Sequence, residues 1–128
     1  MGDHATSESH IRVLIADDQA LFARALEALL ADDDEVEVIG HAKNGAEAVE
    51  LADAEHPDVI LMDISMPLMD GLEATRELRS HGSDARVVML TESDLRADTV
   101  RAKRAGADAY VPKTHIAAGL RDAIHAVA

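Results

Sequence analysis

Three short, uninterrupted runs of apolar residues set the strongest limit on how this chain folds. They occupy residues 13–16, 59–62 and 87–90. Continuous apolar runs of this length are typical of strands buried on both faces, as in a parallel sheet, whereas a strand with one wet face alternates apolar and polar residues. The runs therefore predict a parallel sheet that is covered on both sides.

Between these runs, apolar residues recur at the spacing of an α-helix. Phe22, Leu26 and Leu30 fall on one face of a predicted helix over residues 21–30. The other predicted elements are strands at 36–40 and 109–111 and helices at 46–55, 72–80, 95–105 and 116–127. Strand and helix alternate five times, which predicts an α/β fold with right-handed crossovers.

Composition excludes several classes of protein. The 128 residues suffice for one domain, expected at 11–128, after a disordered polar leader at 1–10. A net charge of −13 argues against direct nucleic-acid binding. Without cysteine, without an apolar run near the ~20 residues of a membrane span and without signal-peptide features, we expect a soluble cytoplasmic protein.

Polar residues follow four of the five predicted strands. They are Asp17 and Asp18, Asp63, Thr91, and, after Tyr110, Lys113. Ligands of open parallel sheets bind outside the carboxyl ends of the strands, so these side chains are expected to meet. Each has an ordinary alternative, such as helix capping by Asp17, Asp18 or Thr91, but together they predict a site.

The predicted set has a consistent chemistry. Three carboxylates repel one another, and a hard divalent cation with oxygen ligands relieves that repulsion, so we expect Mg²⁺. The formal charges of three aspartates, one lysine and Mg²⁺ cancel. Asp63 is then placed to act as an in-line nucleophile and form an aspartyl phosphate, with positioning and charge neutralisation as the main catalytic effects.

These residues and their surroundings resemble the receiver domain of two-component response regulators. The similar blocks are residues 11–18, 58–71, 88–91 and 106–113. The resemblance extends from about Ile11 to the C-terminus and is strongest to the NarL/FixJ-type branch, whose members usually add a helix-turn-helix output domain. It implies a flavodoxin-like, three-layer (βα)5 fold with strand order 2-1-3-4-5.

The resemblance also implies roles for the predicted site residues. Asp63 would accept a phosphoryl group from a sensor histidine kinase. Mg²⁺ would be held by Asp18, Asp63 and the backbone carbonyl of Ser65, with Asp17 acting through water. Thr91 would donate a hydrogen bond to the phosphoryl group, and Lys113 would pair with it.

A switch is implied as well. Tyr110 would turn inward as Thr91 moves toward the phosphate, and this would change the face made by helix 95–105, strand 109–111 and helix 116–127. The output would be transcription through a DNA-binding domain outside this chain, or protein contacts of a stand-alone receiver, and phosphorylation could drive formation of a homodimer. Such a domain is not an enzyme, although it assists its own phosphotransfer and dephosphorylation.

Two positions depart from the usual receiver pattern. Thr114 follows Lys113 where many receivers have proline, which leaves open whether the Lys113–Thr114 bond is cis. Glu92 follows Thr91 where a small residue is common. Glu92 either restricts access to the site or is an ordinary solvated side chain.

Other functional interpretations of the sequence have less support. Phosphatases that resemble haloacid dehalogenases form an aspartyl phosphate and place a second aspartate two residues after the nucleophile as general acid, but Ser65 stands there. The acidic run at 32–35 is expected to be a solvated loop, and His41, His56, His81, His115 and His125 show no spacing for a zinc site. The basic residues of helix 95–105 form either a docking surface or a solvated face.

Overall fold

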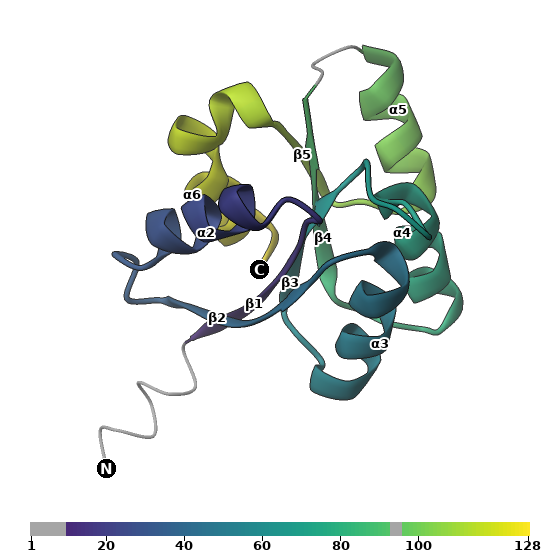
Figure 1. Cartoon of the computed structure of the whole chain (residues 1–128), viewed down its shortest axis with the longest axis horizontal. Helices are drawn as coiled ribbons and strands as arrows, with labels where there is room; N and C mark the ends of the chain where they lie inside the picture. Colours follow the sequence, from purple (N-terminus) through teal and green to yellow (C-terminus); the bar gives the residue numbers. More distant parts are fainter. Residues whose placement is uncertain (1–9, 93–95) are drawn as a thin grey trace.

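The computed structural model describes residues 10–92 and 96–128, which form a five-stranded parallel sheet between two layers of helices (Figure 1). The strand order is β2-β1-β3-β4-β5, so the predicted order 2-1-3-4-5 is confirmed. The strands are β1 (Ile11–Ala16), β2 (Val36–Ala42), β3 (Val59–Asp63), β4 (Arg86–Thr91) and β5 (Ala109–Pro112). Residues 1–9 of the predicted leader lie outside the described residues.

The predicted helices are all present. They are α2 (Ala20–Leu30), α3 (Gly45–Glu55), α4 (Gly71–Ser80), α5 (Arg96–Ala105) and α6 (Ile116–Val127). The described bounds agree with the predictions within two residues, and Leu95, the predicted first residue of α5, lies outside the described residues. A short 3₁₀ helix, η1 (Lys113–His115), was not predicted. In the part of the chain that the structure describes, no helix is long and apolar enough to cross a bilayer.

The two faces of the sheet have separate cores. Leu14, Ile60 and Met62 face the layer of α3, α4 and α5, whereas Val13 and Leu61 face α2 and α6. Neighbouring residues of a strand point to opposite faces, so β1, β3 and β4 need apolar side chains at nearly every position. This two-sided burial explains the continuous apolar runs.

Two features near the start of α4 fix the end of β3. Asp70 caps the helix by accepting a hydrogen bond from the Glu73 amide at 2.8 Å. A side chain at Gly71 would collide with the backbone oxygen of Asp63, so this position favours glycine. The close approach holds the acidic end of β3 against α4.

The helix-capping alternative for the first acidic pair is not observed. The N-cap residue of α2 is Gln19, and its side chain makes no capping hydrogen bond. One carboxylate oxygen of Asp17 accepts a hydrogen bond from the Gln19 amide at 2.8 Å, which shapes the turn before the helix.

Candidate functional site

The register of the sheet brings the predicted site residues to one edge. Ala16 pairs with Met62, so Asp17 and Asp63 follow paired positions on adjacent strands. Thr91, the last residue of β4, pairs with Pro112, the residue before Lys113. The carboxyl ends of β1, β3, β4 and β5 therefore converge, as the sequence pattern predicted.

Three carboxylates meet at this edge. One oxygen each from Asp17, Asp18 and Asp63 lies within 4.8 Å of the others. Asp17 and Asp63 are each only 4% exposed, whereas Asp18 is exposed. Two of the three negative charges are thus removed from bulk water. Inside the protein, the repulsion between them is only weakly screened.

Lys113 supplies the compensating charge. Its Nζ lies 3.2 Å from Oδ2 of Asp17 and 3.5 Å from Oδ2 of Asp63, and its side chain is 10% exposed. The same Nζ lies over the ring of Phe22, 4.2 Å from the ring centroid. One buried cation thus bridges the two buried carboxylates.

One lysine does not offset the cost of three carboxylates. Burial, and secondly the charge of Asp17, raise the pKa of Asp63 to about 6, although Lys113 and the Ser65 amide act in the opposite direction. A divalent cation would relieve this repulsion, and Mg²⁺ commonly takes one or two carboxylates and completes its octahedron with other oxygens. The donor set therefore fits Mg²⁺.

A cavity of about 520 Å³ opens over the carboxylate of Asp63. Its walls include Asp18, Asp63, Ser65, Thr91 and Glu92. Thr91 is buried and Glu92 is exposed, so the glutamate stands at the mouth. The cavity gives a small anionic group room to reach Asp63.

Two further charged residues of the cavity wall were not predicted as site residues from the sequence. Asp98 and Arg101 of α5 line it, and Nη1 of Arg101 lies 3.3 Å from Oδ1 of Asp98. Their i, i+3 spacing is visible in the sequence, but only the packing of α5 shows that this side of the helix faces the site. Arg101, one of the basic residues of α5, thus lines the cavity.

The comparison with known families identifies the chain. The family described as "Response regulator receiver domain" matches residues 13–125. The chain belongs to this family. It is of the NarL/FixJ-like type, as the resemblance of its motifs implied.

Individual relatives agree with this assignment. The receiver domain is 38% identical to the transcriptional regulatory protein DegU of Brevibacillus brevis, over 95% of this chain and 52% of that protein. It is 36% identical to the chemotaxis protein CheY of Halobacterium salinarum, over 88% of this chain and 92% of CheY. The chain thus spans about half the length of its DegU relative and nearly the whole of a CheY.

A solved structure shows the same fold. The signal receiver domain of the putative response regulator NarL from Mycobacterium tuberculosis superimposes with a TM-score of 0.83 at 33% identity, covering 91% of this chain and 98% of that one. The similarity of sequence and of structure therefore extends over nearly all of the receiver domain.

The structure also describes Tyr110, the predicted switch residue, and the geometry of the Lys113–Thr114 peptide bond. Tyr110 of β5 is half-buried and packs against the core on the α3–α4–α5 side of the sheet. None of the described peptide bonds is cis, so the Lys113–Thr114 bond is trans.

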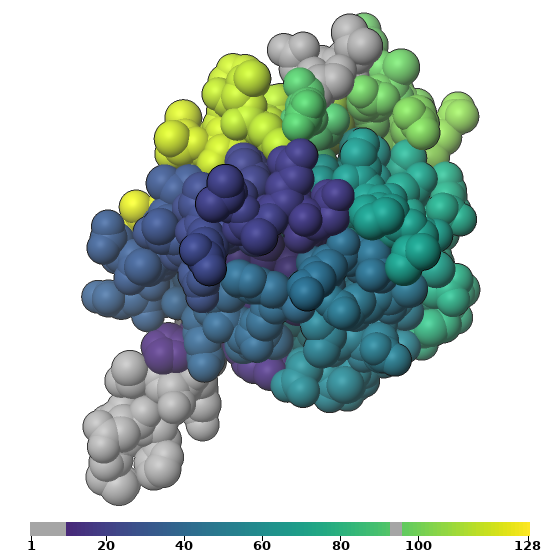
Figure 2. Space-filling view, in the orientation of Figure 1, coloured from purple at the N-terminus to yellow at the C-terminus, as the bar shows by residue number. Residues whose placement is uncertain are grey.

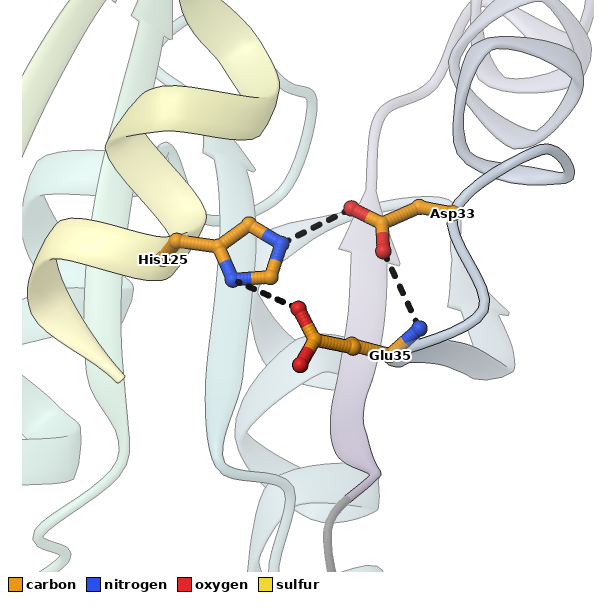
Figure 3. Close-up of side chains that lie close together, drawn as sticks. All are labelled: Asp33, Glu35 and His125. Carbon is orange, nitrogen blue, oxygen red and sulfur yellow. Dashed lines mark hydrogen bonds and ion pairs between the residues drawn. The ribbon is translucent and has the colours of Figure 1, made fainter.

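One expectation of the sequence analysis was wrong. Asp33, expected in a solvated loop, is buried, and Nε2 of His125 lies 2.8 Å from its Oδ2 (Figure 3). The other ring nitrogen of His125 lies 3.7 Å from Glu35, and Arg121 lies 3.6 Å from Asp33. Because the ring turns separate nitrogens toward the two carboxylates and Arg121 adds a positive charge, these contacts describe ion pairs rather than a metal site.

Replacing Asp33 with asparagine is expected to destabilise the receiver domain at neutral pH, by an amount on the order of 1 kcal/mol. The hydrogen bond with His125 lowers the pKa of Asp33 below 3.8, so its stabilising effect is present above that pH and is lost as the pH falls through the lowered value. Denaturant unfolding of both proteins from pH 7 to pH 3 measures the difference. A difference that grows between pH 5 and pH 3 would contradict the ion-pair assignment.

Proposed function

We propose that this receiver domain is a phosphorylation-controlled switch that accepts a phosphoryl group on Asp63 from a sensor histidine kinase. The observation that carries the proposal is the convergence of Asp17, Asp18, Asp63 and Lys113 beside a cavity whose wall includes Thr91. Asp63 combines a nearly buried carboxylate with an opening toward a donor. The kinase partner is expected in the cytoplasm.

The transfer is an in-line displacement. An Oδ of Asp63 bonds to phosphorus while the bond from phosphorus to the kinase histidine nitrogen breaks, and that nitrogen leaves with the electron pair. Lys113, 3.5 Å from Asp63, is placed to pair with the phosphoryl oxygens. The Thr91 hydroxyl, in the cavity wall, is placed to donate a hydrogen bond to the same group.

A magnesium ion fits the acidic part of the site. Asp18, Asp63 and the backbone carbonyl of Ser65 would hold it, with Asp17 acting through water. When bound, Mg²⁺ supplies positive charge that offsets the incoming phosphoryl group. Asp17 then remains available for its ion pair with Lys113.

The response would pass through β4 and β5 to the face made by α5, β5 and α6. Thr91 ends β4, and Tyr110 lies on the adjacent β5. Among the described residues of α5, only Ala102 and Ala105 are buried. So little buried apolar surface means a low cost of moving this helix.

Two kinds of output are compatible with the proposed switch: regulation of transcription, and protein contacts of a stand-alone receiver. Regulation of transcription, through a DNA-binding domain outside this chain, is supported by the DegU relative, of which the chain spans 52%. Action as a stand-alone receiver is supported by the CheY relative, of which it spans 92%. In either mode we expect a kinase partner, allow for a homodimer on phosphorylation, and expect no direct binding of nucleic acid at a net charge of −13.

A hydrolase that passes through an aspartyl phosphate is a weaker candidate. Ser65 lies two residues after Asp63 and cannot protonate a leaving group at neutral pH. Asp98 also lines the cavity, but Arg101 pairs with it. We therefore expect no turnover of phosphate monoesters by this domain.

The switch is tested with beryllofluoride, an analogue of the phosphoryl group, in the presence of Mg²⁺. Two-dimensional amide NMR spectra should show shifts around the cavity and along α5, β5 and α6, and no such shifts in the Asp63→Asn variant. Shifts confined to the residues around Asp63 would contradict a switch, and equal shifts in the variant would contradict Asp63 as the acceptor.

Glu92→Ala is expected to speed phosphorylation by acetyl phosphate, by roughly twofold to fivefold at low salt. An exposed carboxylate at the mouth repels an incoming dianion, and physiological salt, with a Debye length of ~8 Å, weakens this repulsion. The measurement is the phosphorylation rate at two ionic strengths, with Glu50→Ala on α3 as the control of equal charge change. Equal rates for the wild type and Glu92→Ala at low salt would show that Glu92 is merely solvated.

A further inference from the structure

Within residues 10–92 and 96–128, the ammonium group of Lys113 interacts with two carboxylates and one aromatic ring. Oδ2 of Asp17 and Oδ2 of Asp63 lie at 3.2 and 3.5 Å, and the centroid of the Phe22 ring lies at 4.2 Å. An ammonium group has three hydrogens to donate. The negative face of an aromatic ring within about 6 Å attracts such a cation, so the ring serves as a third, uncharged partner.

The position of the ring comes from α2. Phe22 is half-buried and packs against the core between α2, α6 and the sheet, while Leu21 beside it is 81% exposed. Figure 2 shows α2, in purple to blue, at the molecular surface beside α6, in yellow. Phe22 thus contacts both the core on this side of the sheet and the Lys113 ammonium.

A ring suits this position better than another acceptor would. A third carboxylate near Lys113 would repel an incoming phosphoryl group, and a water molecule would screen the ammonium charge. An aromatic face attracts the cation, adds no net charge and keeps water away, which strengthens the remaining electrostatic interactions. It also stays in place if the ammonium turns from Asp17 toward a phosphoryl group on Asp63.

We infer that Phe22 is a positioning residue for phosphoryl transfer: its ring holds the Lys113 ammonium over the acceptor carboxylate. The inference rests on the proposed function of Asp63. Phe22 is not one of the described residues that line the cavity over Asp63. It therefore acts through Lys113 and does not touch the phosphoryl donor.

The test compares Phe22→Leu, which keeps an apolar side chain but removes the ring, with Phe22→Tyr, which restores an aromatic face. With acetyl phosphate at saturating Mg²⁺, Phe22→Leu should lower the maximal rate constant of phosphorylation roughly threefold to tenfold. The acetyl phosphate concentration that gives half of this rate should change less, because the ring does not line the donor cavity. Phe22→Tyr should return the maximal rate constant to near the wild-type value.

Leu29→Ala is the matched control. Leu29 also lies on α2, is half-buried and packs against the same core, but it lies seven residues, about two helical turns, beyond Phe22. This variant should lower the melting temperature and leave the maximal rate constant of phosphorylation unchanged. NMR gives a second readout: ring currents should shift the ε-methylene protons of Lys113 upfield in the wild type and in Phe22→Tyr, but not in Phe22→Leu.

The outcomes separate this inference from the proposed function. A Phe22→Leu variant as fast as the wild type, or a Phe22→Tyr variant as slow as Phe22→Leu, would overturn the role of the ring while leaving Asp63 as acceptor. An equal loss of the phosphorylation rate constant in Leu29→Ala and in Phe22→Leu would show that Phe22 acts only as a core residue. A wild-type protein that takes up no phosphoryl group would overturn the proposed function, and with it this role.

Discussion

Replacing Lys113 with methionine is expected to slow phosphorylation by acetyl phosphate about a hundredfold at saturating Mg²⁺. Methionine keeps an apolar stem but removes the buried cation that lies 3.5 Å from the acceptor oxygen. Charge that accumulates on the transferring phosphoryl group then has one fewer partner in a site shielded from water. The measurement is the initial rate of phosphorylation, which is monitored by mass spectrometry of the intact protein.

Lys103→Met provides the control for this variant. Lys103 lies on the exposed surface of α5, so its loss changes the net charge equally without touching the site. Its rate should stay within twofold of the wild type, an estimate that follows from the screening of exposed charges. A Lys113→Met variant as fast as Lys103→Met would show that the ion pairs of Lys113 serve only the stability of the fold.

Asp63→Asn is expected to make the metal-free protein more stable, by about 1 kcal/mol for unit charges a few ångströms apart near the surface. The substitution removes one of the three carboxylates that crowd within 4.8 Å. It should also abolish or strongly weaken the stabilisation that Mg²⁺ gives the wild type, since a ligand bound only by the folded state raises stability. Asp18→Ala should behave in the same direction.

The pH dependence of this difference has a definite sign. The pKa of Asp63 is raised from 3.8 to about 6 in the folded protein, so the folded state binds a proton more tightly than the unfolded chain does. The ionised group therefore costs stability above pH 6, and this cost disappears as the pH falls toward 3.8. The stability gained by Asp63→Asn should shrink over the same range.

Thermal melts of metal-free protein measure both effects. Asp34→Asn is the control, because Asp34 is exposed and distant in sequence from the site, and its loss changes the net charge of −13 by the same amount. If Asp63→Asn gains no more stability than Asp34→Asn, general charge repulsion and not the crowded carboxylates explains the effect. A lower melting temperature for Asp63→Asn would contradict the repulsion outright.

The fold and the meeting of the site residues were predictable because they depend on short-range patterns. Burial on both faces dictates the apolar runs, and parallel strands place whatever follows them at one edge. Lys113 is 96 residues from Asp17, and strand order alone brings them to the same end of the sheet. No knowledge of side-chain packing was needed for this step.

The roles of neighbouring residues were harder to predict. Asp17 and Asp18 are adjacent in sequence, but Asp17 is buried with Lys113 and Asp18 is exposed. The ion pair between Asp33 and His125 joins residues 92 apart, through the packing of α6 beside the turn before β2. The contact of Phe22 with Lys113 was hidden because a helical apolar spacing indicates only a core residue.

Phosphorylation of Asp63 itself is tested by locating the phosphoryl group in the protein. The protein is incubated with acetyl phosphate and Mg²⁺, the acyl phosphate is reduced with borohydride, and the peptides are mapped by mass spectrometry. We predict one modified side chain, at Asp63, and no modification in Asp63→Asn. A label on Asp17, Asp18 or a hydroxyl side chain, or an Asp63→Asn protein labelled as fully as the wild type, would contradict the account.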